Sequence, residues 1–220
     1  MTIKDKVDVE ALAAAIVGCF PKLSSLEQRV SLELYRLLAA GQPVPRSSLA
    51  ERIGASIETI DQILESWPGV YSDSKGRVVG YWGLAISEAF TSPQALIVEG
   101  QRLSAWCAWD TLFLPQLLGK SATIEAASPA PGGAVTLKVT PERVENVEPT
   151  GACMSFLLPD AAAVQKDVVT ALCHFVYFFP RREDGERWIT QHKGTFLLSM
   201  DQAYSLARRK NELQYFEALA

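Results

Sequence analysis

The chain has 220 residues, of which 48% are hydrophobic, and a formal net charge of −4. This length allows one large domain or two small ones, and the composition is that of a folded protein with a substantial core, not of a disordered chain. The acidic balance argues against a nucleic-acid-binding protein whose affinity rests on neutralising phosphates. No apolar run approaches the roughly 20 residues that cross a bilayer, so no membrane association is expected.

The beginning of the chain allows two interpretations. Residues 16–19 (IVGC) resemble a bacterial lipoprotein cleavage site, but the residues before them are not positively charged, as a signal segment requires. The sequence therefore favours an amphipathic first helix that ends near Pro21.

The next part of the chain is typical of a winged helix. Apolar residues at helical spacing from residue 26 to 38, followed by breaks at Gly41 and Pro43, predict one helix. Two more are predicted over residues 49–53 and 57–66, and residues 69–81 predict a β-hairpin with its turn near 73–76. Three helices and a hairpin make a winged-helix-like module, which we assign to residues 1–80.

Charge argues against DNA binding by this module. Residues 24–66 hold four basic and six acidic side chains, a balance of 4 − 6 = −2. The helix that would enter the DNA groove carries Glu58, Asp61 and Glu65 and no lysine or arginine. The phosphate backbone would repel such a helix, so we expect no nucleic-acid partner.

Residues 81–220 predict an α+β domain with a central, mostly antiparallel or mixed β-sheet flanked by helices. Alternating or apolar stretches predict the strands, and helical spacing predicts the helices, the first of which contains Pro115 and should break or kink there. The predicted strands cover residues 122–127, 134–139, 142–147, 153–158, 175–179 and 196–200, and the predicted helices cover residues 106–118, 160–172, 183–192 and 201–216.

The four cysteines are far apart in the chain and form no CxxC pair: they are Cys19, Cys107, Cys153 and Cys173. Zinc-ribbon and thioredoxin-like patterns are therefore missing, and free thiols in a reducing, cytoplasmic compartment are expected. We predict structural roles for Cys19 and Cys153.

Cys107 and Asp110 are three positions apart, which on a helix or helical turn places both side chains on one face. Trp106 and Trp109 flank them, and an apolar wall raises the pKa of a carboxyl group toward the range of a proton carrier. Two thiolates are soft ligands for thiophilic metals, so Cys107 and Cys173 are candidate metal ligands. Taken singly, each cysteine is more typical of a buried core thiol, and Asp110 of a helix-surface acid.

The joint context of these residues resembles a known family. Residues 106–112 (WCAWDTL), with Pro115 and Gly119 after them, look like the first active-site motif of the organomercurial (alkylmercury) lyases. Residues 172–179 (LCHFVYFF) resemble the second cysteine segment of that family. The resemblance covers most of residues 81–220. One departure is that some members carry a further cysteine near position 128, where this chain has Ser128.

The resemblance implies an enzyme that cleaves the carbon–mercury bond of R–Hg⁺ to a hydrocarbon and Hg(II). Cys107 and Cys173 would capture mercury as substrate and product, Asp110 would relay a proton to the departing carbon, and Trp106 would line the substrate pocket. It also implies no added metal or organic cofactor. Cellular low-molecular-weight thiols, or a mercuric reductase as partner, would then remove the ion.

Two other functions use the same residues. A winged-helix thiol sensor of metals or redox state would regulate transcription through these cysteines without turnover. A non-catalytic relative would bind soft metals in the same pocket without cleaving the carbon–mercury bond. The lyase and the non-catalytic binding protein both require the sulfurs of Cys107 and Cys173 to lie close enough to share one ion.

Overall fold

A computed structural model describes residues 7–216 and 218–219. The described part of the chain starts with four helices, and the first, α1, ends shortly before Pro21, as predicted. The helix α2 begins with a capping box, in which the Ser24 side chain and Glu27 satisfy each other's backbone N–H groups. The four helices are α1 (Val9–Val17), α2 (Ser25–Leu38), α3 (Arg46–Ile53) and α4 (Ile57–Ser66).

The predicted hairpin is present as β1 (Val70–Ser72) and β2 (Val78–Tyr81), and its turn is closed by a hydrogen bond from the Gly76 N–H to the Asp73 carbonyl. These two strands form one edge of an eight-stranded antiparallel sheet with the order β1-β2-β3-β5-β4-β6-β7-β8. The other strands are β3 (Leu84–Ile86), β4 (Gln94–Val98), β5 (Gln101–Ala105), β6 (Ala122–Ala127), β7 (Ala134–Val139) and β8 (Val144–Glu148).

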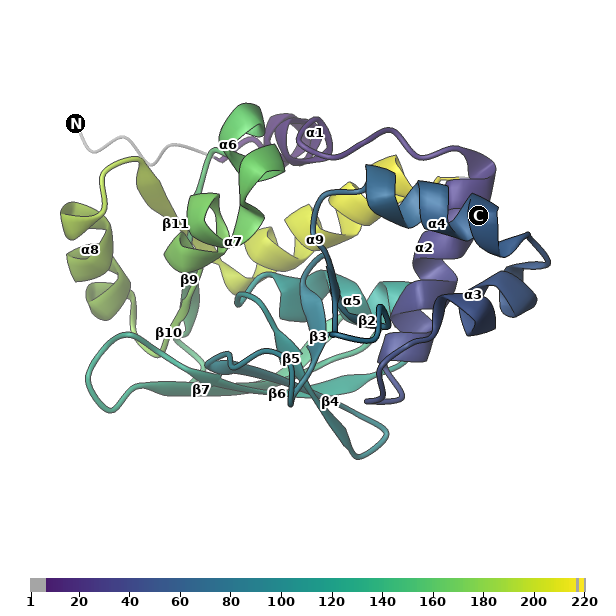
Figure 1. The fold of residues 1–220 in the computed structure, drawn as a ribbon. Coiled ribbons are helices and arrows are strands. Elements are labelled where there is room, and N and C mark those ends of the chain that lie inside the picture. The colour runs from purple at the N-terminus through teal and green to yellow at the C-terminus, as the bar shows by residue number, and fades with distance from the viewer. Residues whose placement is uncertain (1–6, 217, 220) are drawn as a thin grey trace.

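A second, three-stranded antiparallel sheet has the order β10-β9-β11. Figure 1 shows the large sheet along the lower side with α5 and α9 above it, α1 over α9, helices α2–α4 at one end and the small sheet with α8 at the other. The remaining elements are α5 (Asp110–Leu118), β9 (Cys153–Leu157), α6 (Ala161–Lys166), α7 (Val168–Ala171), the 3₁₀ turn η1 (Cys173–Phe175), β10 (Phe178–Phe179), α8 (Arg182–Gln191), β11 (Thr195–Ser199) and α9 (Met200–Gln214).

This architecture confirms the predicted α+β class with a helical, winged-helix-like front part. The predicted boundary between residues 80 and 81 falls inside β2, which pairs with β3 in the same sheet. The division into residues 1–80 and 81–220 stays a prediction.

Three local predictions around the candidate site are wrong. The helix predicted from residue 106 begins at Asp110, because residues 106–109 form a turn, and it continues through Pro115 without a break. The helix predicted over 160–172 is two short helices that meet at Asp167. The strand predicted over 175–179 is reduced to the two residues of β10, and Cys173 opens a 3₁₀ turn instead.

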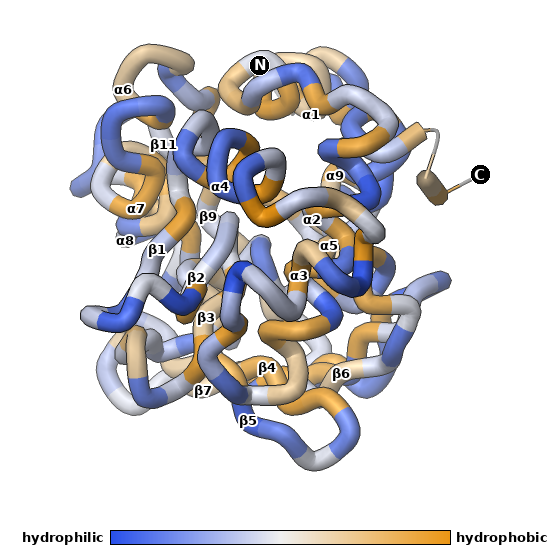
Figure 2. Tube along the Cα trace, turned by 45° about the vertical axis from the view of Figure 1, so that its right-hand side comes forward, coloured by the Kyte–Doolittle hydropathy of each residue, from blue (hydrophilic) through white to orange (hydrophobic). Residues whose placement is uncertain are grey.

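The core lies between the large sheet and the helices that cover it. Strand β6 alternates buried and exposed residues along its length, so one face of the sheet packs inward. Helix α5 contacts β4, β7 and α9, and is buried at all but one of its positions. Figure 2 shows hydrophobic segments mainly along the strands and the inward turns of the helices. Among the described residues, no helix combines the length and apolar character needed to cross a bilayer.

Candidate functional site

The turn before α5 is held by its own polar groups. The Asp110 carboxylate accepts a hydrogen bond from the backbone N–H of Cys107 at 2.7 Å, and the Thr111 hydroxyl donates to the Ala108 carbonyl at 2.6 Å. The residue before the helix, Trp109, offers no side-chain cap, and the Asp110 carboxylate turns back to the N–H of Cys107, which precedes the helix. The Cys-x-x-Asp spacing therefore folds as a turn closed by the carboxylate.

The segment that carries Cys173 is fastened to this turn from the other sheet. The N–H of Ala108 donates to the carbonyl of Val176 at 3.2 Å. The Ser155 hydroxyl, on β9, donates to the Phe175 carbonyl at 2.7 Å and accepts from the Tyr177 N–H at 3.1 Å. These bonds explain why residues 173–177 turn instead of extending as a strand.

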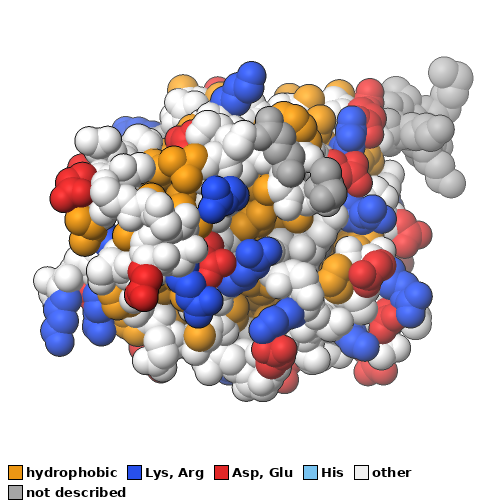
Figure 3. Space-filling view, turned by 90° about the vertical axis from the view of Figure 1, so that its right-hand side faces the viewer, with side chains coloured by type: hydrophobic (Ala, Val, Ile, Leu, Met, Phe, Trp, Pro, Cys, Tyr) orange, Lys and Arg blue, Asp and Glu red, His pale blue; other side chains and the backbone are white. Residues whose placement is uncertain are grey.

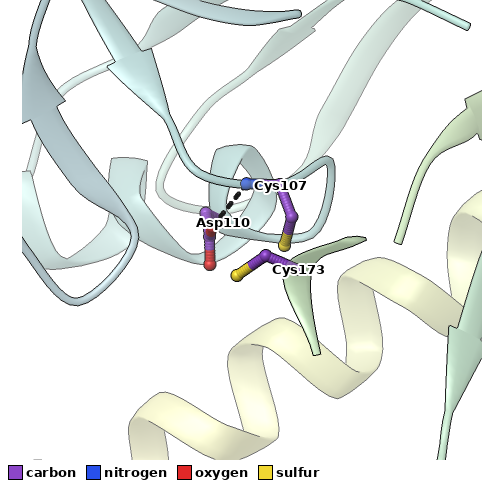
Figure 4. A group of neighbouring side chains, drawn as sticks. All are labelled: Cys107, Asp110 and Cys173. Atoms are coloured by element: carbon purple, nitrogen blue, oxygen red, sulfur yellow. Dashed lines mark hydrogen bonds between the residues drawn. The ribbon is translucent and has the colours of Figure 1, made fainter. Parts of the chain in front are cut away.

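The structure brings Cys107, Asp110 and Cys173 together. One sulfur from each cysteine and a carboxylate oxygen all lie within 4.8 Å of one another. Figure 4 shows the two sulfurs and the carboxyl group grouped at one place between the turn before α5 and the segment of Cys173. The three residues are only 2%, 6% and 4% exposed, in chain order. The spacing suits one soft ion held by both thiolates.

Burial sets the protonation of these groups. Burial, with further contributions from Cys173 and Asp110, raises the pKa of Cys107 well above its ordinary value. A hydrogen bond with Cys107 lowers the pKa of Cys173, but burial and the charges of Asp110 and Asp167 outweigh it, so the net pKa is raised. Burial raises the pKa of Asp110 to about 6, against hydrogen bonds from Cys107. At neutral pH both thiols therefore keep their protons, while Asp110, whose pKa of about 6 lies below this pH, is mostly in the carboxylate form.

A glycine turn sets the position of the Asp110 carboxyl. Gly83 joins β2 to β3 with φ +91°, and a Cβ there would lie 2.7 Å from both Cγ and Oδ1 of Asp110. The Gly83 carbonyl accepts a hydrogen bond from the Trp106 N–H at 3.0 Å. The β2–β3 turn therefore contacts the carboxyl directly and holds the backbone next to Cys107.

The two tryptophans of the motif have different surroundings. Trp109 is anchored in the core, where its Nε1 donates to the Ala203 carbonyl of α9 at 3.3 Å. Trp106 lies toward the hairpin, with its ring 5.2 Å from Tyr71 and 5.9 Å from Phe90 between centroids. The predicted role of Trp106 in a substrate pocket stays a prediction. The predicted structural cysteines Cys19 and Cys153 are buried free thiols outside this group.

A buried lysine on α9 lies behind the site. Lys210 is 1% exposed, and its Nζ lies 4.0 Å from the centroid of Phe113 and donates to Asn211 Oδ1 at 3.3 Å. No ion pair joins it to a carboxylate among the residues that the structure describes. Burial lowers the pKa of Lys210 to about 7, partly offset by the charge of Asp110. The buried ammonium group of Lys210 therefore lowers the free energy of unfolding.

We expect Lys210→Met to raise the free energy of unfolding at pH 7 by about 2 kcal/mol, because it keeps the apolar stem and removes the buried charge. The native state holds this proton only up to pH about 7, whereas the unfolded chain holds it to its ordinary pKa of 10.5. The stability of the parent protein should therefore rise between these two pH values, and the variant should lose that rise. Urea unfolding at pH 6, 7 and 9 measures both effects. Lys120→Met, at an exposed surface pair with Glu99, is the control and should change neither.

Sequence reasoning missed three of these residues. Lys210 falls in the buried helical spacing of Ala203, Leu206 and Ala207, so its position on the inner face of α9 was a usable signal. Gly83 follows two aromatic residues at positions 81–82, which indicates a turn, but the sequence does not show that this turn contacts Asp110. Nothing in the sequence connects Tyr71 with Trp106.

Comparisons with known proteins identify the family of the chain. Residues 89–211 match the family model described as alkylmercury lyase, and residues 21–82 match the helix-turn-helix domain of alkylmercury lyase. The chain is 38% identical over 175 residues to an alkylmercury lyase of Staphylococcus epidermidis, covering 80% of this chain and 78% of that protein. It is 36% identical to one of Pseudomonas putida over 173 residues, covering 79% of this chain and 78% of that one.

A solved structure shares the fold. The crystal structure of the mercury-bound form of MerB2 has a TM-score of 0.74 with this chain at 19% identity, covering 98% of this chain and all of that one. At this identity the likeness concerns the fold alone. The family models and the curated relatives show more than the fold, because they establish that the chain belongs to the alkylmercury lyase family.

Proposed function

We propose that this protein cleaves the carbon–mercury bond of organomercurials R–Hg⁺, with Cys107 and Cys173 binding mercury and Asp110 relaying the proton. The observation that carries the proposal is the buried group of two thiols and one carboxyl within 4.8 Å. Thiolates suit a soft ion, and a positioned carboxyl replaces the dilute protons of water at the carbon.

The protonation of the site supports the order of steps. Both thiols start with their protons, because burial raises the pKa of Cys107 and, net, that of Cys173. As the first sulfur bonds mercury, its proton passes to the Asp110 carboxylate, and the second sulfur bonds mercury with release of its proton to solvent. Electron donation from both sulfurs weakens the carbon–mercury bond, and the carbon takes the proton of Asp110 with the bonding electron pair.

This sequence balances as R–Hg⁺ plus two thiols giving R–H, Hg(II) held by two thiolates, and one proton. Asp110 ends as the carboxylate in which it began, and no electron is gained or lost by an external reagent. These steps use no cofactor. Release of Hg(II) from two buried thiolates requires competing thiols of the cell, or transfer to a mercuric reductase, in the cytoplasm.

A thiol sensor that regulates transcription would need a positively charged DNA-binding surface, and helix α4 does not supply one. On α4, Asp61 and Glu65 pair with Arg46 of α3 at 2.9 and 3.6 Å, so this arginine is already engaged by acidic groups. Figure 3 shows basic and acidic side chains intermingled over this end of the molecule. Such a surface would not supply the phosphate neutralisation that DNA binding needs.

The test is an assay of the intact protein with phenylmercury and excess thiol, in which benzene is measured by gas chromatography. We expect catalytic release of benzene, well above the release by thiol alone or by heat-denatured protein. Uptake of mercury without benzene would instead identify a non-catalytic binding protein. Salt-dependent binding to duplex DNA without turnover would favour the sensor.

A further inference from the structure

The β1–β2 hairpin brings an aromatic side chain of the front part to the thiol site. Tyr71 on β1 is 44% exposed, yet its ring meets Trp106 edge-on, with centroids 5.2 Å apart and an interplanar angle of 76°. Trp106 directly precedes Cys107 in the chain. The proton relay described above makes no use of Tyr71.

Strand register explains this contact. Tyr71 pairs directly with Gly80 on β2, so the two positions share one face of the sheet. Gly80 has no side chain, and a Cβ there would lie 3.7 Å from Cζ2 of Trp106. The Trp106 ring therefore lies over Gly80 and beside Tyr71. The register also shifts directly after Tyr71, an irregularity of the kind that re-aims side chains next to active sites.

Tyr71 also lies within electrostatic reach of the second cysteine. Burial, followed by the charges of Asp167 and Cys173, raises the pKa of its hydroxyl. Tyr71 therefore contacts Trp106, the residue before Cys107, and interacts electrostatically with Cys173. The two thiols are only 2% and 4% exposed, whereas Tyr71 is 44% exposed, so Tyr71 offers solvent an aromatic surface that also contacts the residue beside Cys107.

We propose that Tyr71 is a specificity-determining residue which, with Trp106, forms an aromatic wall for the organic group of R–Hg⁺ and favours aryl over methyl groups. This inference rests on the lyase function proposed above. An aryl ring packs edge-on or offset against both side chains, whereas a methyl group offers little surface to either. The hairpin of the winged-helix-like part would then serve substrate selection.

The experiment compares kcat/KM for phenylmercury and methylmercury in the full-length protein and in Tyr71→Phe, Tyr71→Leu and Tyr71→Ala. We expect Tyr71→Ala to lower the phenyl-to-methyl ratio by about five- to tenfold, because one aromatic contact is lost for one substrate only. Tyr71→Phe should keep the ratio within about twofold, since the ring is retained. Phe216→Ala removes an aromatic side chain that is 60% exposed elsewhere on the surface, and it should leave the ratio unchanged.

Each outcome decides one claim. If the parent protein cleaves both substrates and Tyr71→Ala keeps the parent ratio, the inference is overturned while the lyase function stands. Equal losses of both rates in Tyr71→Ala and Tyr71→Leu would assign Tyr71 a structural role and also overturn it. If the parent protein cleaves neither substrate, the lyase function fails and the inference falls with it.

Discussion

Serine in place of Cys107 or of Cys173 is expected to lower the rate of benzene release from phenylmercury by about a thousandfold or more. A hydroxyl is a hard, weakly acidic ligand that does not replace a thiolate on a soft ion. Either change therefore removes half of the electron donation to mercury while leaving the backbone hydrogen bond from the Cys107 N–H to Asp110 that closes the turn.

The controls are the two buried cysteines outside the site. Cys19 donates its thiol hydrogen to the Ala15 carbonyl at 3.3 Å, and Cys153 packs against Gly185. Cys19→Ser and Cys153→Ser should keep the rate of benzene release within about threefold, because each replaces a buried thiol that does not bind mercury. Mercury retained after gel filtration gives the second readout, and only the site variants should lose it. An unchanged rate in Cys107→Ser would refute the assignment of that thiol.

Asn in place of Asp110 is expected to lower the rate of benzene release by about a hundredfold or more, while Hg(II) still binds. The amide is close in size to the carboxyl and keeps an oxygen for the Cys107 N–H, but it cannot take a proton from a thiol and pass it on. Loss of turnover with retained binding separates the proton relay from mercury capture. Normal turnover in Asp110→Asn would show that the proton comes from another group.

Gly83→Ala tests the position of the same carboxyl without removing it. The added Cβ would lie 2.7 Å from Asp110 Oδ1, so the carboxyl must move, and the rate should fall between those of the parent and of Asp110→Asn. The matched control is Gly194→Ala, where φ is +86° and no atom lies within 4 Å of the added Cβ. It shares the backbone strain without the clash and should lose stability but not turnover.

Regular patterns made part of the fold predictable. Strands β6 and β7 and helix α4 have the predicted bounds, because alternation or helical spacing marks their buried faces. Strands β3, β4 and β5 were missed, since β3 is buried at every position and β4 at all but one, and β5 is buried over its last three residues. Such strands show no alternation to read from the sequence.

The meeting of the three candidate residues was predictable from the sequence, whereas the backbone that carries them was not. The types and contexts of Cys107, Asp110 and Cys173 pointed to one chemistry, and the structure brings the three together. The helix expected from residue 106 and the strand expected from residue 175 were wrong for a common reason. Both segments are shaped by hydrogen bonds to distant partners, Val176 for the first and Ser155 for the second, which local sequence does not encode.

The hydrogen bond between Ala108 and Val176 joins the turn that follows β5 of the large sheet to the segment that precedes β10 of the small sheet. Mercury held by both thiolates would tie the same two parts by strong bonds, closing a loop of 173 − 107 = 66 residues. A covalent link across a loop of this length lowers the conformational entropy of the unfolded chain, which raises the free energy of unfolding by on the order of 4 kcal/mol. Each turnover would therefore leave the enzyme cross-linked by its own product, and the thiol that strips the ion would restore both the catalyst and its ordinary resistance to unfolding.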